Sequence, residues 1–201
     1  AFLYFAYPAS WSGDMSWVAV DGYTAATMLG ISAQDGYASM PEAYTWSNAF
    51  FGLVPGSIGE TSTIAILLGL AILLVTKIAS YRIVGGVILG TVVTSYFFNL
   101  VGSDTNPMFQ MPFWWHMVMG GYAFGLVFMA TEPVSGSHTN AGRWIYGFVI
   151  GFMVIMIRVL NPAYPEGMML AILFGNLLSP LIDHFVVSRN ISYRNKVLNA
   201  K

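Results

Sequence analysis

Oxygen-bearing side chains recur at helical spacing in one apolar stretch near the end of the chain. Asn176, Ser179 and Asp183 would share one helix face, and the proline after Ser179 would free the backbone carbonyl of Asn176. Together they offer a carboxylate, an amide oxygen, a hydroxyl and a carbonyl. These are the hard ligands that broken membrane helices present to Na+. The alternative is that Asp183 only ends a helix near the headgroups and pairs with Arg143 or Arg189.

Two glutamates could extend such a cation path. Glu132 follows an apolar stretch and could join Asp183 at a cation entrance, or could be a solvated loop carboxylate. Glu60 ends the sequence Ser57-Ile58-Gly59-Glu60, which has the form of a capping box. A glutamate in a first helical turn is favoured by the helix dipole, so a Na+ role for Glu60 ranks second. The spacing of the three histidines predicts no transition-metal site.

Two threonine hydroxyls lie close behind an acidic turn near the start of the chain. The stretch reads Asp21-Gly22-Tyr23-Thr24-Ala25-Ala26-Thr27. An Asp-Gly pair is typical of a turn. A threonine after a turn is a good N-cap, because its oxygen accepts a hydrogen bond from the first helical turn. On spacing alone, we predict a turn that leads into a helix capped by Thr24 or Thr27.

The composition is that of a membrane protein. The 201 residues are 56% hydrophobic and only 8% charged, against about 25% charged residues in a soluble domain. There is no cysteine, which excludes disulfides, thiol catalysis and cysteine-held iron–sulfur clusters within this chain. There is also no Gly-rich phosphate loop or dinucleotide fingerprint. No basic patch suggests nucleic acid.

Apolar stretches that approach the length of a membrane span follow one another closely. About 20 residues are needed to cross the hydrocarbon. The stretches are residues 57–76, 83–101, 113–130, 144–160 and 168–187. We therefore predict an all-α, polytopic membrane helix bundle of about five transmembrane spans over residues 61–187, the first span beginning near residue 57.

The flanking regions differ from this bundle in composition. Residues 1–60 contain the tail of a preceding helix and an outer-face segment, in which residues 38–53 could form a short re-entrant helix. Residues 188–201 form a basic tail. The basic residues of loops and tail fall on one side of an alternating topology: Lys77, Arg82, Arg143, Arg189, Arg194, Lys196 and Lys201. That side is predicted to be cytoplasmic, with the C-terminus, so Thr27 would face outward.

Glycines repeat four residues apart in three consecutive apolar stretches. The pairs are Gly86 and Gly90, Gly121 and Gly125, and Gly147 and Gly151. Small faces let helices approach closely in lipid. We therefore expect a tightly packed bundle.

Several blocks of the sequence resemble a known respiratory family. The stretch from Asp21 to Thr27 resembles the flavinylation motif of bacterial respiratory complexes. The longer blocks resemble the NqrB subunit of the Na+-translocating NADH:quinone oxidoreductase: Ala130-Thr131-Glu132-Pro133-Val134-Ser135, Arg158-Val159-Leu160-Asn161-Pro162-Ala163-Tyr164-Pro165-Glu166-Gly167 and Leu181-Ile182-Asp183-His184-Phe185-Val186-Val187. The chain opens within an apolar run without a methionine, so we expect it to be the C-terminal half of such a subunit.

The resemblance implies a redox function in the bacterial inner membrane. It implies FMN joined to Thr27 by a phosphoester, with Asp21 and Gly22 read by the attaching enzyme and Thr24 inside the motif. It implies electron transfer from a partner subunit's flavin toward ubiquinone, coupled to Na+ translocation. The other subunits of the complex would bind NADH, and riboflavin would lie elsewhere in the full subunit.

Further residues are assigned to the flavin by position. Arg158 falls at the outer end of the fourth predicted span, on the same face as Thr27. It could neutralise the flavin phosphate or pair with Glu166. Trp17 and Tyr23 are the nearest aromatic candidates for stacking on the ring.

Two alternatives stay open at this point. One is an Rnf-type electron-transport subunit, which shares the motif around Thr27. The other is a passive channel similar to urea transporters, with no redox role. The Asp21–Thr27 motif discriminates against the channel, because a solute channel has no use for a flavin acceptor site.

Overall fold

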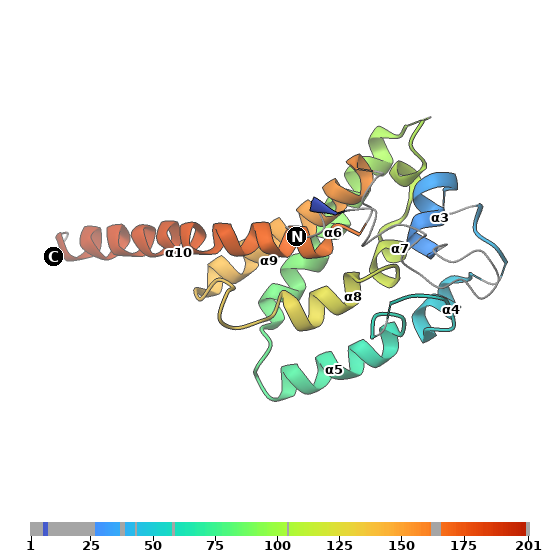
Figure 1. Ribbon diagram of the computed structural model, residues 1–201. Coiled ribbons are helices and arrows are strands. Elements are labelled where there is room, and N and C mark those ends of the chain that lie inside the picture. The colour runs from blue at the N-terminus through green and yellow to red at the C-terminus, as the bar shows by residue number, and fades with distance from the viewer. Residues whose placement is uncertain are drawn as a thin grey trace.

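The elements of the structure are helical throughout the part of the chain that it describes. The computed structural model describes residues 6–7, 27–36, 39–42, 44–57, 59–103, 105–161 and 166–199. Its elements, shown in Figure 1, are α3 (Met28–Asp35), α4 (Trp46–Phe51), α5 (Thr63–Val75), α6 (Tyr81–Val101), η3 (Pro107–Gln110), α7 (Phe113–Val118), α8 (Tyr122–Phe124), η4 (Gly125–Met129), α9 (Asn140–Leu160) and α10 (Met168–Asn199).

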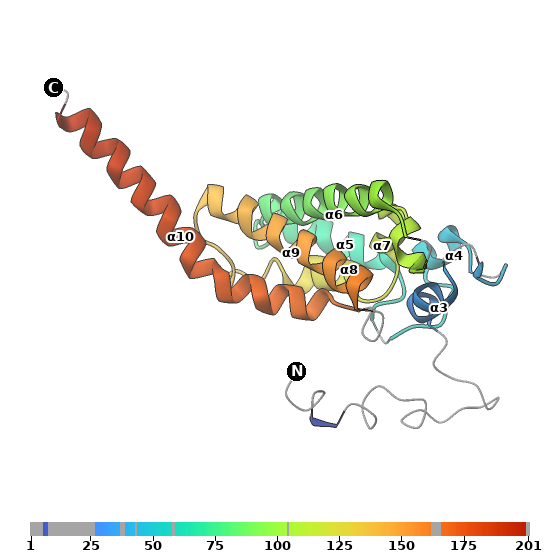
Figure 2. The same ribbon diagram turned by 90° about the horizontal axis from the view of Figure 1, so that it is seen from above.

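Three long helices form the centre of the bundle. Among the described residues, α6, α9 and α10 are long and apolar enough to cross a membrane. α6 packs along α9, and α9 packs against α10. In Figure 2, α6 and α9 begin at the end of the bundle from which α10 projects, whereas α3 and α4 lie at the opposite end. The predicted all-helical membrane bundle is confirmed.

Glycines set the distance between α6 and α9. Gly86 and Gly90 of α6 face Gly147 and Gly151 of α9. A Cβ atom on Gly86 would lie 2.7 Å from the carbonyl oxygen of Trp144. The two backbones therefore touch, as the four-residue repeats predict.

A side chain at this contact should separate the two helices. We expect Gly151→Ala to lower the free energy of unfolding by about 1–3 kcal/mol, the usual cost of overpacking. The new methyl group would meet the carbonyl oxygen of Val87 and, at 2.8 Å, the amide nitrogen of Thr91. Thermal unfolding in detergent measures the loss. Val93→Leu on the exposed face of α6 is the control, and an equal loss there would contradict the interpretation.

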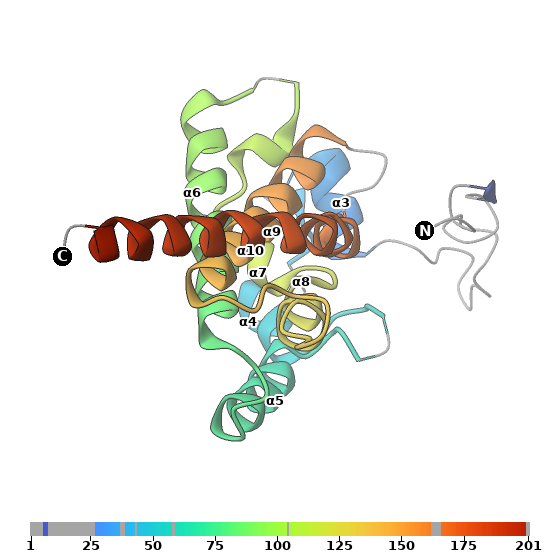
Figure 3. The same ribbon diagram turned by 90° about the vertical axis from the view of Figure 1, so that its left-hand side faces the viewer.

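The first predicted span begins later than expected. The amide of Glu60 donates to the carbonyl of Ser57 at 3.1 Å, and Gly59 has a φ of 86°, so these residues form a turn and not a helix. The helix α5 then begins at Thr63 and has 13 residues, with Ser62 as its N-cap. The prediction that a capping box at Ser57 opens this helix is therefore wrong. Figure 3 shows α5 along one edge of the molecule.

The third predicted span, residues 113–130, is not one helix. α7 ends at Val118, Met119 is extended, and Gly120 has a φ of 61°. The chain then turns through α8 into η4, a π-helix that ends at Met129. The prediction of a continuous span is wrong here, because a left-handed glycine interrupts the helix.

Two further boundaries differ from the prediction. Among the described residues of the range 38–53, the α-helix is α4, which Thr45 caps and a left-handed Gly52 ends. The tail expected from residue 188 is helical as far as Asn199, since α10 runs for 32 residues and includes Pro180. Its last part extends beyond the bundle (Figure 2).

Candidate functional site

Thr27 stands at the beginning of α3. Its backbone is extended, and its Oγ1 atom accepts a hydrogen bond of 3.1 Å from the amide of Gly30. Thr27 is exposed. This confirms one of the two predicted helix caps. The other predicted residues of this site, Asp21, Gly22, Tyr23, Thr24 and Trp17, lie outside the described residues.

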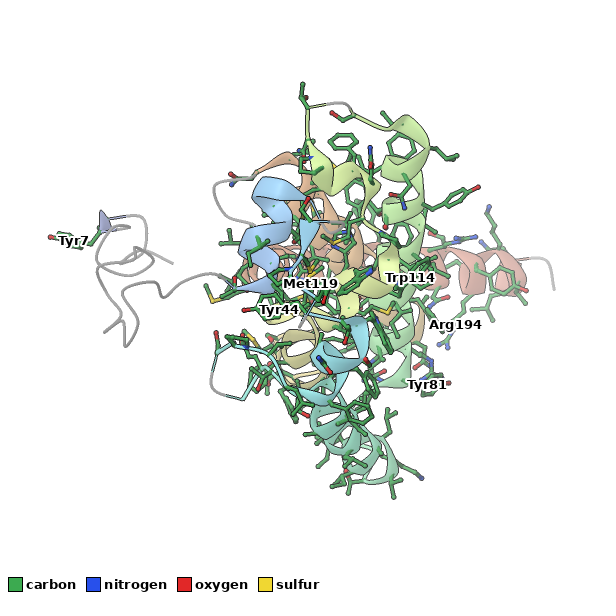
Figure 4. All side chains as sticks on the ribbon, turned by 90° about the vertical axis from the view of Figure 1, so that its right-hand side faces the viewer. Tyr7, Tyr44, Tyr81, Trp114, Met119 and Arg194 are labelled. Carbon is green, nitrogen blue, oxygen red and sulfur yellow. The ribbon has the colours of Figure 1, made fainter. Side chains whose placement is uncertain are left out.

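Buried contacts fix α3 against the bundle. Met28 and Leu29 are buried directly after Thr27. The Ser32 hydroxyl donates to the carbonyl of Leu29 at 2.9 Å and lies 4.0 Å from the sulfur of Met119. Figure 4 shows Met119 inside the molecule beside α3. The exposed residue Thr27 is thus attached to a helix that buried contacts hold in place.

A hollow opens beside Thr27, where α3, the loop before α5 and the break after α7 meet. Its lining combines apolar side chains, backbone and two carboxylates: Thr27, Met28, Leu29, Val54, Pro55, Gly56, Ser57, Glu60, Thr61, Val118, Met119, Gly120 and Glu166. The hollow places the predicted flavin acceptor and Glu60 in one site. It also includes Glu166, which the sequence analysis considered only as a partner of Arg158.

Arg158 supports the break between α7 and α8 from inside the protein. Its side chain is 0% exposed. Its guanidinium donates to three backbone carbonyls, those of Glu166 at 3.2 Å, His116 at 2.7 Å and Met119 at 2.9 Å. These contacts are neither of the two predicted pairings, since the carboxylate of Glu166 is not the acceptor. A role of Arg158 toward a flavin phosphate stays a prediction.

Two carboxylates flank the break from the other side. Glu166 Oε2 accepts a hydrogen bond of 3.0 Å from the amide of Gly121. A Cβ atom on Gly120 would lie 2.6 Å from the Glu166 oxygens, and one on Gly121 would lie 2.9 Å from Glu60 Oε1. Burial raises the pKa of Glu60, and the negative charge of Glu166 raises it further. Only glycines leave room for both carboxylates here.

Asp183 binds the loop that precedes α9. Its Oδ1 atom accepts from the hydroxyls of Ser137 and Thr139, each at 2.6 Å, and from the amide of Thr139 at 3.1 Å. Its Oδ2 atom accepts from the amide of His138 at 2.8 Å. Arg143, one of its predicted partners, donates instead to the carbonyl of Ser137 at 3.2 Å. Sequence reasoning missed these donors, because they lie more than 40 residues away from Asp183 along the chain.

The other predicted Na+ ligands are divided between two places. Asn176 accepts a hydrogen bond of 2.6 Å from the Tyr146 hydroxyl, and Ser179 is buried on the same helix.

Glu132 accepts from the amides of Val134 and Ser135 and from the Ser135 hydroxyl. The hydroxyl bond is the largest cause that lowers the pKa of Glu132. Glu60 lies apart from these residues, in the hollow beside Thr27. Their role toward Na+ stays a prediction. Within the described ranges, no three His, Cys, Asp or Glu side chains converge on a common point.

The helices define a multi-pass membrane protein, and comparison with known proteins identifies its family. The chain belongs to the NQR2, RnfD, RnfE family, which matches residues 1–192.

Its relatives confirm the resemblance that the sequence blocks indicate. It is 63% identical over 195 residues to the NqrB subunit of the Na(+)-translocating NADH-quinone reductase of Azotobacter vinelandii, covering 96% of this chain and 48% of that protein. It is 59% identical over 196 residues to the same subunit of Chromohalobacter salexigens, covering 98% and 48%. The corresponding protein of Stutzerimonas stutzeri is 60% identical over 195 residues, with coverage of 96% and 48%. The chain thus spans about half the length of these relatives.

Proposed function

We propose that this chain is part of the NqrB membrane subunit of an Na+-pumping NADH:quinone oxidoreductase, and that it carries FMN on Thr27. The observation that carries the proposal is the exposed hydroxyl of Thr27 at the N-terminus of α3, beside a hollow. The motif that precedes Thr27 and the relatives' names support it. The same relatives favour an NqrB subunit over an Rnf-type subunit.

The residues around Thr27 fit a phosphate-linked flavin. A phosphate on Oγ1 would lie at the N-terminus of an eight-residue helix, where the first backbone N–H groups and the helix dipole favour an anion. The hollow combines apolar side chains such as Met28, Val54 and Val118 with the carboxylates of Glu60 and Glu166. The apolar side chains would contact the uncharged ring.

The protein's part in the reaction is to position the flavin and set its surroundings. The flavin, when bound, would supply the electron transfer. Thr27 would hold it, and α3, which packs against the bundle, would fix its position. Burial raises the pKa of Glu60 beside this site, and the charge of Glu166 raises it further. In the proposed complex, electrons come from another subunit that binds NADH and pass toward ubiquinone.

The proposal extends to orientation and to a cation path. Thr27 would lie on the outer face of the bacterial inner membrane and the C-terminus in the cytoplasm, since α3 and the basic beginnings of α6 and α9 lie at opposite ends of the bundle. Na+ would enter near Asp183 and Glu132, with Asn176 and Ser179 further along α10 and Glu60 at the outer side.

The fluorescence of a covalently attached flavin tests the proposal. We expect the full-length protein, expressed with its flavin-attaching enzyme and separated under denaturing conditions, to fluoresce yellow-green under ultraviolet light. Thr27→Ala should abolish the signal completely, because no acceptor oxygen remains, whereas Thr24→Ala should retain it.

Each other outcome has a definite meaning. Loss only in Thr24→Ala would keep the flavin and move its site. A dark wild-type chain beside a fluorescent flavinylated control would contradict the redox proposal and favour a passive channel. Membrane fractions of both variants should contain equal amounts of protein, which separates loss of flavin from loss of fold.

A further inference from the structure

A second cavity lies at the other end of the bundle from Thr27. It is formed by the turn between α5 and α6 and by the loop before α9, and its volume is about 200 Å³. A water molecule occupies about 30 Å³ in the liquid, so the cavity has room for a group of several heavy atoms. The proposed flavin site does not use it, and the proposed cation path shares one lining residue with it, Glu132.

Two basic side chains line the cavity. Lys77 comes from the turn, and Arg143 comes from the first turn of α9. The Nε atom of Arg143 donates to the carbonyl of Ser137 at 3.2 Å. No acceptor is seen for its two terminal nitrogens within the described ranges. One edge of the guanidinium is therefore fixed while the other can bind an anion.

The backbone at Lys77 adds a second observation. Its φ is 60°, and it is the sole non-glycine residue with a positive φ in the part of the chain that the structure describes. It follows Thr76, the C-cap residue of α5, and glycine is the favoured residue for a left-handed conformation at this position. A lysine in this unfavourable backbone conformation motivates the hypothesis that its side chain has a function.

Ser80 brings a neutral donor to the same cavity. It precedes α6 as the N-cap, but its side chain makes no capping hydrogen bond. Its hydroxyl oxygen is buried without a partner among the described residues. A hydroxyl and a helix N-terminus beside two basic side chains are complementary to a phosphate.

One acidic residue, Glu132, also lines the cavity. Both of its carboxylate oxygens accept hydrogen bonds from the turn that follows, Oε1 from Val134 and Oε2 from Ser135. Its carboxylate is therefore bound by its own loop. Lys77 and Arg143 together carry two positive charges against the one negative charge of Glu132, so the lining has a net charge of +1.

We infer that this cavity binds the phosphate of an anionic phospholipid headgroup. The turn and loop that form it join helices of a membrane bundle, where headgroups are found. Ile78 lines the cavity, and Val75 and Val134 lie within two residues of its lining along the chain. All three are exposed apolar side chains, which would contact acyl chains. A free phosphate would gain nothing from them. Basic pockets between membrane helices bind anionic headgroups in this way.

Lipid-dependent unfolding tests the inference. The full-length protein is purified in detergent, and its Tm is followed as dioleoylphosphatidylglycerol or dioleoylphosphatidylcholine is added. We expect only the anionic lipid to raise the Tm of the wild type. The concentration for half of the effect should rise about fivefold in Lys77→Gly and in Arg143→Gln, and about 25-fold in the double variant.

The choice of variants separates binding from folding. Lys77→Gly removes the charge but suits the positive φ, so without lipid its Tm should equal or exceed that of the wild type. Arg82→Gln is the matched control, since Arg82 is close in sequence but stacks on Tyr81 at 4.6 Å and does not line the cavity. Its lipid response should be unchanged.

Three results would overturn the inference. The first is an equal response of the wild type to both lipids, and the second is an equal weakening in Arg82→Gln and Lys77→Gly. The third is an equal rise of Tm with inorganic phosphate alone at the same concentration. That would assign the cavity to a free anion instead of a headgroup.

Discussion

Arg158→Met should destabilise the protein even though it removes a buried charge from an apolar helix. The guanidinium donates to the carbonyls of His116 and Met119, both of which are about 1% exposed. Methionine has a similar length but no donor. Each buried carbonyl left without a donor costs about 1–3 kcal/mol, so we expect a loss of at least about 2 kcal/mol in the free energy of unfolding.

Thermal unfolding of the purified full-length protein measures this loss. Arg158→Lys should be intermediate, because one ammonium group cannot reproduce the planar fork that reaches three carbonyls. Arg189→Met, at an exposed position of α10, should have little effect. A stable Arg158→Met variant would contradict the structural role.

A flavin measurement separates this role from the predicted phosphate contact. If Arg158 acted mainly on the flavin phosphate, Arg158→Met would shift the redox potential of the flavin and leave the Tm unchanged. If it mainly holds the break, the Tm falls. Any change of potential should then be shared by Gly120→Ala, which disturbs the break and its Glu166 carboxylate but keeps the Arg158 guanidinium.

The features that sequence reasoning predicted correctly depend on nearby residues. The long helices α6, α9 and α10 follow from apolar runs of sufficient length. The close packing of α6 and α9 agrees with the glycine repeats on each helix, although the repeats did not predict which helices would pair. The cap at Thr27 is one of the two that were predicted from threonines following an Asp-Gly pair in the sequence. These signals act within one or two helical turns, so the sequence contains them directly.

The break after α7 depends on residues that are distant in the sequence. Its carbonyls are bound by Arg158, 42 residues after His116, and Gly121 is bound by Glu166, 45 residues further on. Adjacent Gly120 and Gly121 inside an apolar run were the available indication of a break. They did not reveal which side chains would support it, because three segments must come together before that support exists.

The partners of Asp183 were missed for the same reason. From the sequence, its neighbours on the helix face suggested a cation site and the nearest arginines suggested ion pairs. The structure surrounds it instead with neutral donors from the loop before α9. A carboxylate has about four acceptor positions, and Oδ2 accepts only one bond within the described residues. A cation contact at Oδ2 is therefore compatible with the loop contacts.

Asp183→Asn should release the loop before α9. Asparagine keeps the shape of the side chain but has a single acceptor oxygen, so its amide would face a hydroxyl or an N–H that now has no acceptor. Hydrogen bonds to a charged group contribute about 1.5–3 kcal/mol each. We expect the free energy of unfolding to fall by about 2–4 kcal/mol, with the loop from Thr131 to Thr139 exchanging its amide hydrogens faster.

A double-mutant cycle with Ser137→Ala shows whether the loss belongs to this contact. The Ser137 hydroxyl donates to Asp183 Oδ1 at 2.6 Å. The sum of the stability losses in the two single variants should therefore exceed the loss in the double variant. His184→Gln changes the exposed neighbour on α10 and should leave the Tm nearly unchanged. Additive losses would mean that the hydroxyl and the carboxylate act independently.

Varying the cation distinguishes loop binding from Na+ binding at the same carboxylate. If Asp183 only holds the loop, Asp183→Asn loses the same stability in NaCl and in KCl of equal concentration. If Oδ2 also contacts Na+, the wild type gains stability with Na+ according to the affinity of the site, and Asp183→Asn loses that gain. A loss confined to Na+ solutions would make cation binding the main role of Asp183. A loss that is equal in both salts would assign Asp183 to the loop alone and remove it from the proposed cation path.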